Sequence, residues 1–154
     1  MVATTKFADS GTIVNVLTYD DNHVKSELEA GVYAVNFNPM SGFYLAKRGE
    51  RLTSVPSRTY GKVHERVEKI MTSYKLSTKS FGILLSGDKG SGKTMTSSLT
   101  ANRCIDELGI PVILIEEAFE GSGLAAFIQQ IGECVLFIDA VSYTHLTLPT
   151  IYSV

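Results

Sequence analysis

The sequence has few cysteines, little net charge and no long apolar run. Its two cysteines, Cys104 and Cys134, lie inside apolar stretches and show neither a metal-ligand spacing nor a disulfide pattern. The formal net charge of -2 and the pI near 5.9 argue against a nucleic-acid surface that works by bulk positive charge. No apolar run approaches the roughly 18 residues that a membrane-spanning helix needs, and the opening residues lack the pattern of a signal peptide. These absences predict a soluble protein of a reducing, cytoplasmic compartment, with no membrane partner.

What the sequence does have is the composition of a folded α/β protein. Of its 154 residues, 44% are hydrophobic and 19% are charged, which suits a globular chain with a buried core. The first part, residues 1–57, carries strand signals at residues 12–17, 32–37 and 43–47. A loop with Pro39 and Gly42 separates the last two, so they predict a β-hairpin within a small β-rich N-terminal region.

The pattern changes after residue 58. Val63, Val67 and Ile70 recur at helical spacing and predict an amphipathic helix over residues 60–74. Short apolar runs then alternate with helical patterns, in the order strand 81–85, helix 93–108, strand 111–115, helix 122–131 and strand 135–138. This β-α-β-α-β order predicts a parallel sheet covered on both faces, and Gly109 before Pro111 is expected to end the first of the two helices.

One motif in this second part carries chemistry. Eight consecutive residues match G-x-x-x-x-G-K-[ST] without departure: Gly87, Asp88, Lys89, Gly90, Ser91, Gly92, Lys93 and Thr94. The glycines allow tight turns that present backbone N–H groups to phosphate oxygens, and the following helix adds a partial positive charge. Lys93 supplies a full charge for the β- and γ-phosphates, and the Thr94 hydroxyl is placed to coordinate Mg²⁺. The motif predicts binding of a nucleoside triphosphate, ATP with Mg²⁺, with Met95 completing the binding set.

A second metal ligand is expected from an Asp at the end of an apolar strand. Residues 135–138 are followed by Asp139, which stands 46 residues after Lys93. This separation leaves room for a helix, a strand and a second helix before the return strand, so Asp139 can approach the phosphate loop. Asp139 is therefore predicted as a metal ligand and, with Lys93, as a catalytic residue.

The two motifs and their spacing resemble an AAA+ ATPase. The run GDKGSGKT is similar to a Walker A motif and the run CVLFID to a Walker B motif. Tyr60 and Gly61, at the start of the amphipathic helix, are similar to the short aromatic-Gly element that lines the adenine pocket in that family. Over residues 58–139 the resemblance implies a partial P-loop ATPase core. In a complete protein, it implies a homo-oligomer that couples ATP hydrolysis to remodelling of a macromolecular partner.

The sequence departs from the AAA+ pattern after Asp139. The family places a Glu at the next position to polarise the attacking water, whereas this chain has Ala140. The expected sensor residue, arginine finger and helical lid do not follow. Residues 140–154 contain no Asp, Glu, Lys or Arg and are interpreted as a non-native or disordered tail, with a genuine polar tail as the alternative.

Two other functions remain open from the sequence. A small-molecule P-loop kinase commonly lacks the Glu after its Walker B Asp, although compact kinases usually begin directly at the P-loop strand. A regulatory module that binds a nucleotide without hydrolysing it also accommodates Ala140. The β-rich front region and Tyr60-Gly61 favour the AAA+ interpretation.

Overall fold

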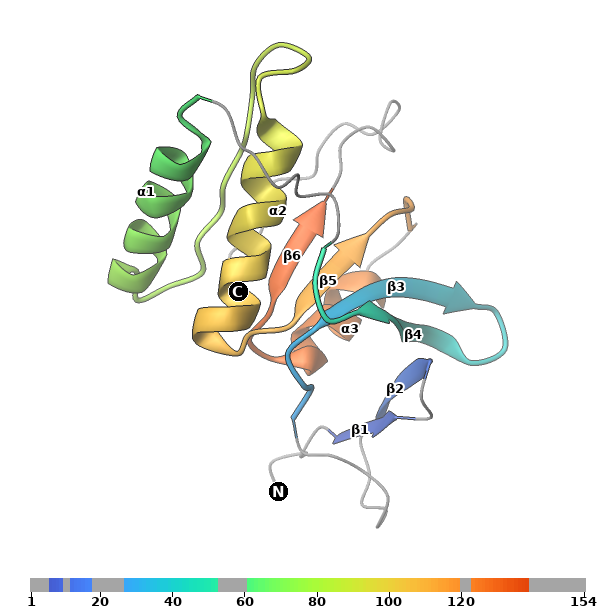
Figure 1. Cartoon of the computed structure of the whole chain (residues 1–154). Coiled ribbons are helices and arrows are strands. Elements are labelled where there is room, and N and C mark those ends of the chain that lie inside the picture. The colour runs from blue at the N-terminus through green and yellow to red at the C-terminus, as the bar shows by residue number, and fades with distance from the viewer. Residues whose placement is uncertain (1–5, 10–11, 18–26, 53–60, 120–122, 139–154) are drawn as a thin grey trace.

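The computed structural model describes residues 6–9, 12–17, 27–52, 61–119 and 123–138. They form a mixed α/β structure in which one six-stranded sheet carries helices on both faces (Figure 1). The strands are β1 (Lys6–Asp9), β2 (Ile13–Leu17), β3 (Val32–Asn38), β4 (Gly42–Gly49), β5 (Val112–Ile115) and β6 (Val135–Ile138). The helices are α1 (Val63–Leu76), α2 (Lys93–Arg103), the π-helical turn η1 (Cys104–Leu108) and α3 (Gly123–Ile131).

The front of the chain forms antiparallel strands, as the strand signals and the loop between two of them predicted. The predicted hairpin is confirmed, because β3 and β4 pair from Val32 opposite Gly49 to Asn38 opposite Gly42. Gly42 has φ +79°, a left-handed conformation that the tight reversal needs and that glycine adopts without steric cost. Strand β2 confirms the signal at residues 12–17, whereas β1 was not predicted.

The sheet is mixed, with strand order β1-β2-β4-β3-β5-β6. Strand β3 joins the two parts of the sequence, since it pairs antiparallel with β4 and parallel with β5, with Val32 opposite Val112. Strands β5 and β6 pair in parallel, with Ile115 opposite Ile138. The prediction of a parallel sheet therefore holds only for β3, β5 and β6.

Alternate residues of β5 supply the two faces of the core. Ile113 and Ile115 point into a cluster that includes Phe127 and Ile131 of α3. Val112 and Leu114 point to the opposite face, where they form a second cluster with Ala101 of α2. The predicted covering of both sheet faces by helices is thus confirmed.

Helix α1 packs on the outer side of α2 rather than on the sheet (Figure 1). Its buried residues Val63, Val67 and Met71 form a cluster with Cys104, and Met95 and Leu99 of α2 pack against it. Ion pairs from Glu68 to Arg103 and from Lys75 to Glu107 connect the exposed rims of the same contact. Helix α1 is consequently held on α2 by an apolar strip with charged pairs beside it.

The strand predicted at residues 81–85 is wrong. The segment has no strand assignment and runs from α1 to α2 outside the sheet (Figure 1). The side chains of Phe81, Ile83 and Leu84 are exposed. An apolar run becomes a strand only where a neighbouring strand accepts its backbone hydrogen bonds, and no described strand pairs with this segment. The β-α-β-α-β order consequently lacks its first strand.

The remaining helical predictions are confirmed, with one difference. The predicted helix over residues 93–108 is α2 followed by η1, because the last turn widens at Cys104. Gly109 ends it with φ +68°, as predicted, and donates its N–H to the Ile105 carbonyl at 3.1 Å. Asn102 connects α2 to the segment that follows β4, because its side-chain amide hydrogen-bonds to both the N–H and the C=O of Leu52.

Candidate phosphate-binding loop

The glycine loop leads directly into the first turn of α2. Three of its glycines have positive φ, with values of +140° at Gly87, +85° at Gly90 and +84° at Gly92. L-residues rarely adopt such angles, so these positions need glycine. A Cβ atom at Gly87 would lie 3.2 Å from the Ser91 Oγ, and a Cβ atom at Gly92 would lie 3.2 Å from the Val63 Cγ2. The loop therefore turns in a way that few other sequences allow.

Several backbone donors of the loop are unused within the described part of the chain. Ser91 donates its N–H to the Asp88 carbonyl at 3.2 Å, which closes a turn, and Thr96 donates to the Gly92 carbonyl at 2.8 Å. Among the described residues, no backbone carbonyl accepts the N–H groups of Gly90, Gly92, Lys93 and Thr94. These donors lie at the positive end of the α2 dipole, where anions are stabilised.

The Lys93 side chain folds back over its own loop. Its Nζ donates to the Gly87 carbonyl at 2.7 Å and to the Asp88 carbonyl at 2.8 Å. The ammonium group is thus held at the loop, where carbonyl dipoles are its partners. A phosphate oxygen carries more negative charge than a carbonyl oxygen and would compete for the same donors.

Hydroxyl groups along α2 divide into two kinds. Thr96 donates its Oγ1 hydrogen to the Gly92 carbonyl at 2.9 Å, and Thr100 donates to the Thr96 carbonyl at 2.8 Å. Thr94, in contrast, is exposed, and its hydroxyl bonds to none of the residues that the structure describes. The predicted magnesium ligand is therefore accessible at the second residue of α2.

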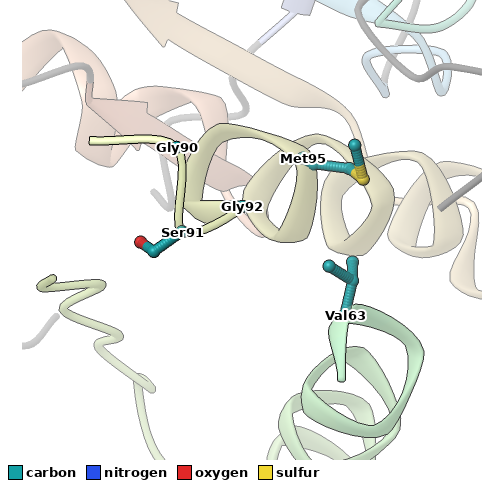
Figure 2. A pocket seen from close by; sticks show the side chains of 5 residues that line it. All are labelled: Val63, Gly90, Ser91, Gly92 and Met95. Carbon is teal, nitrogen blue, oxygen red and sulfur yellow. The ribbon is translucent and has the colours of Figure 1, made fainter. Parts of the chain in front are cut away.

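A pocket of about 240 Å³ lies between the loop and the start of α1. Figure 2 shows Val63 of α1 and Met95 of α2 beside the turn made by Gly90, Ser91 and Gly92. Ligand sites for whole drug-sized molecules usually have about 300–1,000 Å³. The pocket is smaller than that range, and the Val63 and Met95 side chains give it an apolar wall.

The surroundings of the loop are basic. Arg66, on the first turns of α1, donates from Nη1 to the Ser91 carbonyl at 3.1 Å. Within the described ranges, no carboxylate forms a salt bridge with the cationic side chains of the loop and the first turns of α1, which are Lys62, Arg66, Lys89 and Lys93. Their charges therefore remain available to an anion. The role of Arg66 was missed from the sequence, because it lies 25 residues from Ser91 in a helix that only the fold brings to the loop.

Two predicted site residues, Tyr60 and Asp139, lie outside the described residues. Gly61, the partner of Tyr60 in the predicted adenine element, is exposed in the turn before α1 and has φ +74°. Strand β6 confirms the predicted apolar run and ends at Ile138, the residue before Asp139. Figure 1 shows the carboxyl end of β6 beside the N-terminal half of α2.

The two cysteines carry no chemistry of this site. Burial raises the pKa of the Cys104 thiol and raises that of Cys134 to about 11, so both remain protonated near neutral pH. Cys104 lies 3.8 Å from the sulfur of Met71 in the α1–α2 contact. No group of three or more His, Cys, Asp or Glu residues within the described chain is arranged to hold a metal ion. Such a cage is not needed at nucleotide sites, where Mg²⁺ takes one or two protein ligands together with phosphate oxygens and water.

Comparisons with known proteins add no relative. No protein-family model, no curated protein and no solved structure matches the chain. Of the helices that the structure describes, none has the length and apolar character to cross a membrane.

Proposed function

We propose that this chain binds a nucleoside triphosphate, ATP with Mg²⁺, through residues 87–95. The observation that carries the proposal is the loop before α2, where an unbroken G-x-x-x-x-G-K-[ST] run coincides with positive-φ glycines and unused backbone donors. The lysine of the motif already lies over that loop. Successive N–H groups with a neighbouring ammonium group make a binding site for the β- and γ-phosphates.

The residues at hand fit a magnesium ion that arrives with the nucleotide. The Thr94 hydroxyl would be one protein ligand, and Asp139 is the predicted second one. The ion would neutralise charge between the β- and γ-phosphates. The apolar wall of Val63 and Met95 supports a base or ribose on the α1 side of the loop.

The wider function that we propose is that of an AAA+ type ATPase. It rests on the resemblance of the two motifs and their spacing, and it includes a homo-oligomeric state and a macromolecular partner in the complete protein. The expected P-loop strand at residues 81–85 is the part of that arrangement that the described fold does not contain. A kinase or a non-hydrolysing nucleotide-binding module therefore remains an alternative function for the same loop.

The binding proposal is tested by calorimetric titration with Mg-ATP and, separately, with AMP. We expect ATP to bind more tightly, because AMP lacks the β- and γ-phosphates that the loop and Lys93 would hold. Equal affinities for the two nucleotides would contradict a phosphate-binding role for residues 87–94.

Phosphate release tests whether this chain contains a complete hydrolytic site. We expect the chain to bind ATP yet hydrolyse it negligibly, because Ala140 cannot orient a water molecule. The arginine finger of the AAA+ pattern was not identified in the sequence either, and a trans-acting arginine alone can be worth about 10³–10⁵ in rate. Turnover near the enzymatic range of about 1 per second or faster would instead require a complete hydrolytic site. Measuring the same preparation with Lys93→Ala identifies any contaminating ATPase.

A further inference from the structure

Arg66 makes a contact with the phosphate loop that the motif does not explain. Its guanidinium donates to the backbone carbonyl of Ser91 at 3.1 Å. Within the described part of the chain, it is the one side chain from outside the loop and α2 that hydrogen-bonds to the backbone of residues 87–92. The contact therefore joins α1 to the turn from which α2 starts.

The position of Arg66 is set by the packing of its helix. Its neighbours on α1, Val63 and Val67, are buried against α2 and η1, and Val63 approaches Gly92 closely. Two residues after Arg66, the Glu68 carboxylate pairs with Arg103 of α2. Because these contacts fix α1 on α2, Arg66 reaches Ser91 from a rigid base.

The Ser91 carbonyl and the Gly92 N–H belong to one planar, trans peptide unit, in which they point in opposite directions. Holding the carbonyl toward Arg66 consequently directs the Gly92 N–H away from α1. Gly92 has φ +84°, and a glycine next to a peptide unit leaves that unit freer to rotate than any other residue does. Without a partner for the carbonyl, this N–H would lose its fixed direction.

We infer that Arg66 is a positioning residue for anion binding. By holding the Ser91 carbonyl, it keeps the Gly92 N–H aimed at the terminal phosphates of a nucleotide or at pyrophosphate. Its charge also raises the local positive potential at the loop. This inference rests on the proposed function and extends it from the motif to α1, a helix that precedes the motif in sequence.

The test is calorimetric titration with pyrophosphate and with Mg-ATP of the unmodified chain and of Arg66→Ala, Arg66→Lys, Lys69→Ala and Lys93→Ala, with the thermal midpoint of each protein measured beside it. Lys69→Ala is the matched control, because Lys69 lies on the same helix, is exposed and pairs with Glu65 rather than with the loop. Arg66→Ala removes one donor and should weaken both ligands about three- to tenfold. Lysine can still donate to a carbonyl, so Arg66→Lys should recover much of that loss, and Lys69→Ala should bind as the unmodified chain does.

Three outcomes would overturn the inference, and they are separable. If Arg66→Ala binds pyrophosphate as tightly as the unmodified chain while Lys93→Ala does not, Arg66 has no positioning role and the proposed function stands. If Arg66→Ala lowers the thermal midpoint and Arg66→Lys restores neither midpoint nor binding, the contact is structural only. If the unmodified chain and Lys93→Ala bind both ligands equally, the proposed function fails together with the inference.

Discussion

Replacing Lys93 with alanine tests the central chemical expectation for this protein. In the structure the Lys93 ammonium group bonds to two carbonyl oxygens, those of Gly87 and Asp88. Binding of a triphosphate would exchange these neutral acceptors for charged phosphate oxygens. The substitution therefore removes a partner from both the free and the bound state, and the difference between the two determines the measured effect.

The magnitude follows from the two kinds of hydrogen bond. A hydrogen bond that involves a charged group contributes about 1.5–3 kcal/mol, compared with about 0.5–1.5 kcal/mol for one between neutral groups, and the Lys93 ammonium group is charged in both its carbonyl and its phosphate contacts. Because the lysine gives up carbonyl contacts when it takes a phosphate, we expect a loss near the lower end of the charged range. This corresponds to an affinity for Mg-ATP that is about tenfold weaker or somewhat more.

The assay is calorimetric titration of both proteins with Mg-ATP, with Lys89→Ala as the control. Lys89 belongs to the same loop, but it occupies a variable position of the motif and is exposed. Its replacement should change affinity less than that of Lys93, since it removes general positive charge and no predicted side-chain contact with the phosphates. Equal losses for the two variants would mean that the loop attracts anions by charge alone, and no loss for Lys93→Ala would refute the predicted site.

Two further predictions concern the structure around the loop. Gly92→Ala should lower the free energy of unfolding in urea more than Gly90→Ala does. Both positions have positive φ, which costs an L-residue about 1–2 kcal/mol. Only at Gly92 would the new Cβ also lie 3.2 Å from the Val63 Cγ2. Equal losses would show that the Val63 contact relaxes freely. The Tyr74 hydroxyl donates to the Glu133 carboxylate at 2.7 Å, which together with burial raises the pKa of Tyr74 to about 12 from 10.0. Because the folded pKa is the higher one, this contribution, about 0.5–1 kcal/mol after solvent screening, is present below pH 10 and should fade between about pH 10 and 12. The free energy of unfolding of Tyr74→Phe should not show this loss across that pH range. An identical pH dependence in the two proteins would exclude the Tyr74–Glu133 hydrogen bond as the cause of the loss.

Local patterns in the sequence predicted the elements whose structure depends on near neighbours. The apolar spacing of Val63 and Val67 belongs to the helix that buries them, and the loop at Gly42 returns the chain between two pairing strands. The motif glycines adopt the positive φ values that make their residue type necessary. In each case the determining interactions lie within a few residues, where periodicity and turn chemistry report them.

Pairing between distant segments was decided by the tertiary structure alone. The apolar run at residues 81–85 has the composition of a strand, yet it lies outside the sheet, and no described strand pairs with it. Strand β3 pairs in parallel with β5, with Val32 opposite Val112, 80 positions later in the sequence. This pairing makes one mixed sheet, and no local pattern in either segment predicts it. The bond from Arg66 to the Ser91 carbonyl has the same origin, since α1 reaches the loop only through its packing on α2. The partner strand of β3 and the side chain that bonds to the Ser91 carbonyl are both far away in the sequence. The residues next to these backbone groups therefore do not reveal which partner will satisfy them.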